Sequence, residues 1–184
     1  MKTLSSFVTL ISSSLLLVGC MSGLPVWTAG EVPFVGTPPE VVDRMLEIAE
    51  VKEGNVVYDV GSGDGRIVIR AAKRYGVRAV VIEIDRELVE RSRAQARAEG
   101  VEHLAEFRQQ DALKVDLTEA TVVTLYMYPE FNAKLRPNLA KLKPGARVVS
   151  HDFGIEDWTP TKIEKLPGGF LHDHTIYLWK IEGP

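Results

Sequence analysis

The sequence predicts an α/β fold, with a mostly parallel twisted sheet, helices on both faces and a C-terminal antiparallel hairpin. Three observations support this. Short apolar runs alternate with segments of helical periodicity between residues 37 and 153, the first of these runs ends in a glycine loop, and Pro167-Gly168-Gly169 separates two final strand-like runs. The 184 residues, 45% hydrophobic and 26% charged, are enough for one globular core.

The first 20 residues resemble a bacterial lipoprotein-type signal peptide. Lys2 precedes an apolar segment too short for a comfortable transmembrane helix, and Leu17-Val18-Gly19-Cys20 resembles a lipobox. The resemblance implies cleavage before Cys20 and lipid on its thiol. Cys20 is the only cysteine, so an intramolecular disulfide is excluded, but a buried reduced thiol or an uncleaved anchor stays open. We expect a leader at 1–20, a linker at 21–35 and one domain at 36–184.

The domain is predicted to open with a helix over residues 38–49. Thr37 is suited to cap it, with Pro38 in the first turn and Glu40 completing a capping box. The preceding residues 33–36 either fold over a ligand or are only a lead-in; the sequence does not choose between these.

Residues 55–65, NVVYDVGSGDG, predict a buried strand that runs into a glycine loop. The spacing Gly61-x-Gly63-x-Gly65 lets the backbone lie against a ligand, but the dinucleotide fingerprint needs glycine where Arg66 stands. Asp59 at the strand end suits S-adenosylmethionine, which presents a sulfonium and an amino group rather than a phosphate. An ordinary strand-to-helix turn remains the alternative at this point.

The following elements alternate in the same way. We expect, in order, a helix at 66–75, a strand at 78–84, a helix at 86–99, strands at 105–110 and 121–127, a helix at 129–142, a strand at 146–153, and hairpin strands at 161–166 and 175–181. Residues 112–120 leave little room for a crossover helix. Pro137 is expected to kink or split its helix.

Acidic residues stand at the ends of the first three predicted strands, as Asp59, Glu83 and Asp111. Right-handed crossovers bring these strand ends around one crevice. Glu83, about 20 residues past the glycine loop, is placed to take both hydroxyls of a ribose. Its alternative role is to cap the next helix, for which Asp85 is better placed.

Together the motifs DVGSGDG, VVIEID and QQDA resemble those of class I, seven-strand S-adenosylmethionine-dependent methyltransferases with a Rossmann-like sheet. The resemblance covers roughly residues 32–181. It implies that Glu83 holds the ribose and that Asp111 accepts from the adenine amino group. It implies that Asp59 and the loop glycines hold the methionine part. The further cofactor contacts that it implies are Thr37, Asp59, Gly61, Ser62, Gly63, Gly65 and Ala112.

Residues 125–153 and 33–46 resemble the small protein-lysine methyltransferases, including archaeal, mitochondrial and histone-lysine enzymes. Tyr126-Met-Tyr-Pro129 replaces the Asn/Asp-Pro-Pro-Tyr of many base methylases, which favours a protein lysine acceptor. Tyr126, Tyr128 and Phe34 are candidates for a dry acceptor channel that lowers the pKa of an amine, or are simply core aromatics. A small-molecule or RNA acceptor, and a non-catalytic lipid-anchored binding protein, remain alternatives.

Charge and histidine content limit the other functions. The net charge of −3 gives no strong nucleic-acid signal, and the basic residues between 66 and 97 are interpreted as a solvated face. His151-Asp152 and His172-Asp-His174 are candidate metal ligands. His172 and His174 alternate on an extended segment and could bind zinc together, but no third or fourth ligand has a suitable spacing, so no metal is expected. We expect a monomer attached to the bacterial cell membrane through lipidated Cys20, or a cytoplasmic protein if the leader is not processed. A secreted lipoprotein would face a compartment that lacks the cofactor.

Overall fold

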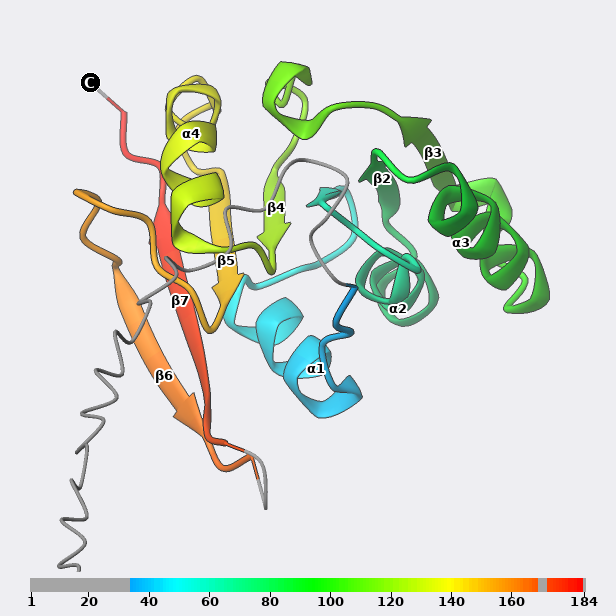
Figure 1. Cartoon of the computed structure of the whole chain (residues 1–184), viewed down its shortest axis with the longest axis horizontal. Coiled ribbons are helices and arrows are strands. Elements are labelled where there is room, and N and C mark those ends of the chain that lie inside the picture. Colours follow the sequence, from blue (N-terminus) through cyan, green and yellow to red (C-terminus); the bar gives the residue numbers. More distant parts are fainter. Residues whose placement is uncertain (1–33, 169–171, 184) are drawn as a thin grey trace, which may run out of the picture.

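The structure is a computed structural model that describes residues 34–168 and 172–183. It shows one seven-stranded sheet with helices packed against it (Figure 1). The predicted signal peptide, Cys20 and nearly all of the predicted linker lie outside the described residues. Within them, no helix is both long enough and apolar enough to cross a membrane.

The elements follow the predicted order. They are α1 (Pro39–Ile48), β1 (Val56–Val60), α2 (Arg66–Tyr75), β2 (Arg78–Glu83), α3 (Arg86–Ala98), η1 (Glu102–Leu104), β3 (Ala105–Gln109), η2 (Ala112–Lys114), β4 (Val122–Leu125), α4 (Pro129–Leu139), β5 (Arg147–His151), β6 (Lys162–Leu166) and β7 (His174–Lys180). The stretch between β3 and β4 holds only the short turn of η2, as its length predicted. β4 and β5 are shorter than predicted because the chain leaves the sheet earlier at their C-terminal ends.

The strand order is β3-β2-β1-β4-β5-β7-β6. Strands β1 to β5 pair in parallel, and β7 runs antiparallel between β5 and β6, which confirms the terminal hairpin. The chain proceeds outward from β1 to β3 and then returns to β4 on the other side of β1. Such a reversal opens a crevice at the C-terminal ends of β1 and β4, where open α/β sheets bind ligands.

Apolar side chains of alternate strand positions fill two core layers. On one face Val57 and Val122 pack beneath α1 and α2, and Val81 packs beneath α2 and α3. On the other face Val123 and Val148 pack against α4 and the segment around η2. Both faces are therefore covered, as the near-continuous apolar strands predicted.

Two local predictions were wrong. Helix α1 begins at Pro39 with Pro38 as its N-cap and no side-chain cap, so the Thr37 capping box does not form. Thr37 lies one residue too early to reach the first helical amides, and its hydroxyl instead lies 3.2 Å from the Nδ1 of His151. Of the kink or split expected at Pro137, the split does not occur: α4 passes Pro137 and ends at Leu139, before the predicted residue 142. Pro137 lies in the last turn, where few residues of the helix remain beyond it.

Candidate cofactor and acceptor site

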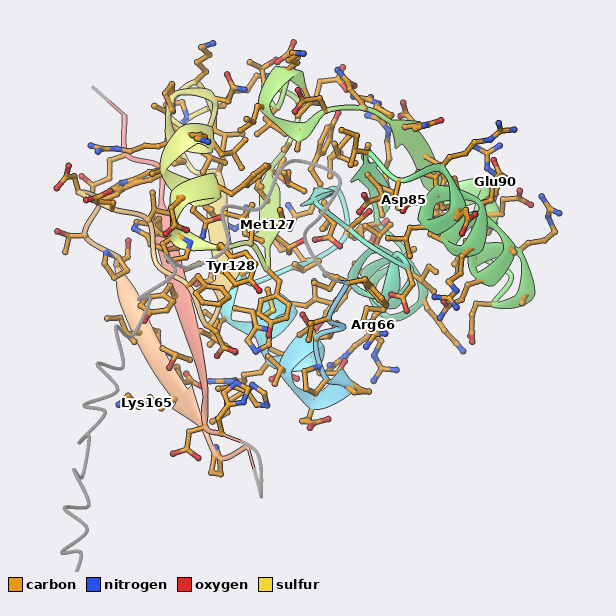
Figure 2. The ribbon with its side chains drawn as sticks, in the orientation of Figure 1. Arg66, Asp85, Glu90, Met127, Tyr128 and Lys165 are labelled. Atoms are coloured by element: carbon orange, nitrogen blue, oxygen red, sulfur yellow. The ribbon has the colours of Figure 1, made fainter. Side chains whose placement is uncertain are left out.

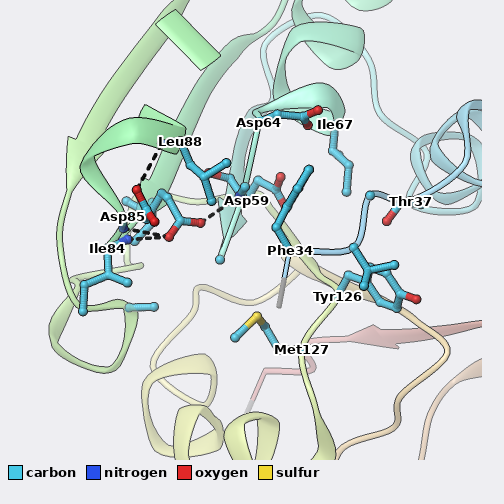
Figure 3. A pocket seen from close by; sticks show the side chains of 18 of the residues that line it. Phe34, Thr37, Asp59, Asp64, Ile67, Ile84, Asp85, Leu88, Tyr126 and Met127 are labelled. Carbon is cyan, nitrogen blue, oxygen red and sulfur yellow. Dashed lines mark hydrogen bonds between the residues drawn. The ribbon is translucent and has the colours of Figure 1, made fainter. Parts of the chain in front are cut away.

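A cavity of about 400 Å³ opens at the C-terminal ends of β1, β2 and β4 (Figure 3). One side is formed by the glycine loop after β1 and by the end of β2. The other side is formed by residues 34–37, which we call the N-terminal strap, and by residues 126–128, which follow β4. Figure 2 shows Met127 and Tyr128 between α4 and α1, with Arg66 between α1 and α2. Segments far apart in the sequence thus surround one space.

The glycine loop has the backbone that its spacing predicted. Gly63 has φ +56°, and a side chain there would collide with the ring of Phe34 in the strap. Gly65 has φ +76°, and a Cβ at this position would lie 2.7 Å from the Cβ of Ser92 in α3. Gly63 therefore allows the strap to close over the loop, whereas Gly65 allows α2 to start directly against α3.

Asp59 presents a buried carboxyl group at the base of the cavity. Its side chain accepts a hydrogen bond from the Thr124 hydroxyl at 2.6 Å, and the residue is 2% exposed. Burial raises its pKa to about 7, with the neighbouring carboxylates of Glu83 and Asp64 adding to the rise against the opposing Thr124 bond. No basic side chain within residues 34–168 and 172–183 forms an ion pair with Asp59. A cationic ligand would supply the missing partner.

Glu83 joins the end of β2 to the glycine loop. One carboxylate oxygen accepts from the amide of Gly63 at 2.8 Å, and the other accepts from the amides of Ile84 at 2.8 Å and Asp85 at 3.0 Å. The latter two bonds are drawn in Figure 3. The oxygen facing Gly63 keeps a free lone pair, so the carboxylate can still accept from a hydroxyl. Asp85, not Glu83, caps α3, as its position predicted.

Asp111 follows β3 and lines the cavity beside Ala112. One oxygen accepts from the amide of Leu113 at 3.0 Å, and the other lies 3.3 Å from the ammonium nitrogen of Lys114. The side chain is therefore held by the start of η2. This position leaves it at the cavity rim, near Glu83 but on a different strand.

Aromatic rings form the opposite wall. Tyr126 stacks on Phe153 with ring centroids 6.0 Å apart, and Tyr128 contacts the same ring at 5.3 Å. Burial raises the pKa of the Tyr126 phenol, with the charge of nearby Asp152 contributing. This wall and Phe34 of the strap form an apolar end to the cavity, opposite the carboxylates.

The comparisons with known proteins agree with this geometry. A family model described as the ANTKMT methyltransferase domain matches residues 59–162. A protein-lysine N-methyltransferase of Saccharolobus islandicus (strain REY15A) is 46% identical over 152 residues, which are 82% of this chain and 94% of that protein. The chain belongs to the ANTKMT methyltransferase family.

A curated relative and a solved structure are also similar to this chain. The Mus musculus adenine nucleotide translocase lysine N-methyltransferase is 35% identical over 135 residues, which cover 72% of this chain and 58% of that protein. The crystal structure described as an RNA methyltransferase from Salinibacter ruber, in complex with S-adenosyl-L-homocysteine, is 53% identical, with a TM-score of 0.77 over 82% of this chain and 95% of that chain. The present protein is an S-adenosylmethionine-dependent methyltransferase.

The residues of this ANTKMT-family methyltransferase fit that cofactor. The hydroxyl oxygen of Ser62 is buried at the cavity wall and has no hydrogen-bond partner among the described residues. Asp59 lacks a cation, and Gly63 leaves the loop backbone open. An unpaired hydroxyl beside a buried carboxyl matches a ligand that carries amino and carboxylate groups.

Most predicted site residues of the methyltransferase line the cavity. They are Thr37, Asp59, Gly61, Ser62, Gly63, Glu83, Asp111, Ala112, Tyr126 and Tyr128, with Phe34. Gly65 is outside this lining, and its missing side chain serves the packing of α2 against Ser92. Its predicted cofactor contact stays a prediction.

Arg66 was seen in the sequence only as a missing glycine. In the ANTKMT-family fold its guanidinium lies 5.6 Å from the Phe34 ring centroid, donates to the Thr37 carbonyl at 3.1 Å and pairs with Asp64 at 2.7 Å. It therefore ties the strap to the glycine loop. Its placement directly after the third glycine was the only sequence signal that could have indicated this.

Histidines gather next to the aromatic wall of the methyltransferase. His151 and His174 contact each other through ring nitrogens 3.0 Å apart, and Asp152 lies beside both. The sequence argument against a metal rested on the lack of a third ligand near His172 and His174. The fold brings His151 and Asp152 to that position, so this argument no longer holds.

Proposed function

We propose that this protein transfers methyl groups from S-adenosylmethionine to the ε-amino group of lysine in a protein substrate. The proposal is supported by the relatives named as lysine methyltransferases, of which one is 46% identical over nearly its full length. The observation that carries it is the apolar wall of Tyr126, Tyr128 and Phe153 facing the carboxylate end of one cavity.

In this proposal the cofactor lies along the carboxylate end. Asp59 and Ser62 bind the polar groups of its methionine part, which lies against the loop backbone at Gly61 and Gly63. Glu83 accepts from the ribose hydroxyls, and Asp111 accepts from the adenine amino group beside Ala112. The N-terminal strap with Thr37 covers this end. The buried position of Asp59 strengthens its attraction to a cation, because little water screens the two charges.

The aromatic wall prepares the acceptor. A lysine ammonium has no lone pair, so it must lose a proton before it attacks. Tyr126 and Tyr128 form a channel that removes water from the amine and lowers its pKa. The amine lone pair then forms a bond to the methyl carbon while the carbon–sulfur bond breaks, leaving neutral S-adenosylhomocysteine and an ammonium that releases a proton to water. Positioning supplies most of the acceleration, because the sulfonium is already activated.

The decisive experiment incubates the purified protein with tritiated S-adenosylmethionine and cell extract. We expect label in protein that survives nuclease, and mass spectrometry of the labelled band should place it on lysine. The Asp59→Asn variant should give no label, and Asp116→Asn, at an exposed carboxylate outside the cavity, should label like the wild type. If nuclease removes the label and protease does not, the result would contradict the lysine acceptor.

RNA is the second candidate acceptor, because the 53% identical structure is described as an RNA methyltransferase. The nuclease arm of the same experiment separates the two acceptors. A complete absence of label, together with binding of the cofactor in calorimetry, would instead favour a binding protein without turnover.

We further propose that the protein is attached to the membrane through lipid on Cys20. The support is the Leu17-Val18-Gly19-Cys20 sequence after an apolar segment. Because the cofactor is a cytosolic metabolite, turnover in this proposal requires that the domain stays at the inner face of the membrane. The domain from residue 36 onward would then act on substrates at that surface.

A further inference from the structure

Three of the four histidines of the chain gather at one place, although the sequence separates them. His151 ends β5 and is followed by Asp152, and His174 begins the antiparallel neighbour β7, with His172 two residues before it. The remaining histidine, His103, lies in η1 next to β3 at the opposite edge of the sheet. The gathering is therefore a product of the β5–β7 pairing.

We propose that His151, Asp152 and His174 form a binding site for a divalent transition metal, Zn²⁺ in the first place, behind the aromatic wall of the cavity. Two imidazole nitrogens and a carboxylate oxygen are ligands that zinc accepts. The site uses residues that the cofactor pocket does not, and its occupancy is independent of the proposed acceptor.

The distances between the three ligand atoms have the scale of a metal site. The Nε2 of His151 lies 3.0 Å from the Nδ1 of His174 and 3.2 Å from an oxygen of Asp152, and that oxygen lies 3.7 Å from the Nδ1 of His174. Metal–ligand bonds of about 2.0–2.2 Å in a tetrahedron place ligand atoms roughly 3.3 Å apart. The three separations lie on either side of that value.

Hydrogen bonds and a cation would use these atoms in different ways. A single proton on the Nε2 of His151 points at either the His174 nitrogen or the Asp152 oxygen, not at both. A cation at the centre accepts lone pairs from all three atoms together. The Nε2 of exposed His172 lies 2.9 Å from the same oxygen of Asp152, so this side chain or a water is at hand for a fourth position.

The surroundings also match those of metal ligands, whose remaining polar atoms are held by neighbouring groups. The second oxygen of Asp152 accepts from the amide of Thr175 at 2.9 Å, and the Nδ1 of His151 lies 3.2 Å from the Thr37 hydroxyl. Asp152 has φ +57°, a left-handed conformation that is uncommon for a residue other than glycine. The surrounding structure holds this conformation, and with it the carboxylate stays beside both histidines.

A metal here would connect three parts of the acceptor side. It would hold the end of β5 to the start of β7, and through His151 it would act on Thr37 of the strap. The ring of His151 also lies 4.0 Å, centroid to centroid, from the ring of Tyr126. The metal is thus placed to position the aromatic wall without touching the cofactor.

The test measures Zn²⁺ binding directly. The full chain, freed of affinity-tag histidines and treated with a chelator, is titrated with zinc chloride in a calorimeter. We expect one equivalent to bind. Thr37→Val removes the hydroxyl beside the Nδ1 of His151 and should weaken the affinity for Zn²⁺ about 10- to 100-fold. His174→Ala and Asp152→Asn each remove a proposed metal ligand and should weaken this affinity further. The matched control His103→Ala should bind like the wild type.

Two further measurements keep the result interpretable. Circular dichroism reports whether each variant is folded, and binding of S-adenosylhomocysteine does so for the variants at His174, Asp152 and His103, which lie outside the cofactor cavity. Visible absorption of the Co²⁺-loaded protein reports tetrahedral coordination. Strong visible bands that disappear in Asp152→Asn would support the site. Absence of zinc binding by the wild type, or equal affinity in folded His174→Ala and Asp152→Asn, would overturn the proposal and leave a hydrogen-bonded cluster.

Discussion

The buried carboxyl of Asp59 should weaken the fold above neutral pH, and its replacement by asparagine should reveal this. In Asp59→Asn the side-chain oxygen can still accept from the Thr124 hydroxyl, whereas the charge is removed. The rise of the Asp59 pKa from 3.8 to about 7 corresponds to about 4 kcal/mol, at about 1.4 kcal/mol per tenfold change in proton affinity. Burial is the main cause of this cost.

The sign follows from proton linkage. The folded state of the wild type binds the proton of Asp59 more tightly than the unfolded state, so its stabilising effect is complete below about pH 4 and is lost as the pH rises through about 7. The stability of Asp59→Asn relative to the wild type should therefore increase by about 4 kcal/mol between pH 4 and pH 8. The buried amide nitrogen of the asparagine lowers the whole curve by about 1–3 kcal/mol without changing this difference.

Urea denaturation of both proteins at several pH values measures the effect. The control Asp64→Asn should show little change relative to the wild type between pH 5 and pH 8, and the opposite sign only below about pH 4. Burial raises the pKa of Asp64, but the hydrogen bonds and charge of Arg66 outweigh it and lower that pKa. Binding of S-adenosylmethionine, measured by calorimetry, should also depend on pH. The wild type should bind it up to about tenfold more weakly per pH unit below 7, because the cationic cofactor needs ionised Asp59. The affinity of Asp59→Asn should not show this pH dependence. A stability difference that is the same at pH 4 and pH 8 would refute the reasoning.

Three other outcomes are expected. Glu83→Ala should weaken cofactor binding in calorimetry and lower the free energy of unfolding by about 1–3 kcal/mol per stranded amide, because three backbone amides lose their acceptor; binding equal to the wild type would remove Glu83 from the ribose site. Gly65→Ala should destabilise by more than the about 1–2 kcal/mol of a left-handed alanine, since its Cβ meets Ser92. Gly100→Ala, with φ +74° and no atom within 4 Å of the added Cβ, should show only the backbone part, and equal losses in urea denaturation would exclude the steric contact. Cys20→Ser should abolish incorporation of radiolabelled fatty acid into the protein in cells, and unchanged labelling would exclude the lipobox.

Prediction from sequence succeeded where the signal is local. The alternation of apolar runs, with a glycine after α2 and α3, indicated the four α-helices and the seven strands but not η1 or η2, because these patterns repeat within a few residues. The gathering of three carboxylates at the cavity was predictable for the same reason. Asp59, Glu83 and Asp111 lie at or just after the C-terminal ends of β1, β2 and β3, and parallel strands bring these ends to one edge of the sheet.

Local rules failed where a distant group competes. Thr37 has the sequence context of a helix cap, yet its hydroxyl contacts His151, which lies 114 residues away. Pro137 has the chemistry to break a helix, yet its position in the last turn of α4 leaves the helix intact. Neither outcome is visible in a window of a few residues, because each depends on where the element ends or on what packs beside it.

The sequence by itself therefore determined the order of the elements, the buried faces and the carboxylates of the cofactor edge, since backbone periodicity and strand direction act locally. Only the tertiary structure decided which side chains meet across strands. It placed Arg66 between the strap and the glycine loop, and Glu83 on the amide of Gly63. It also brought His151 to His174, because the pairing of β5 with β7 sets their distance and sequence spacing does not.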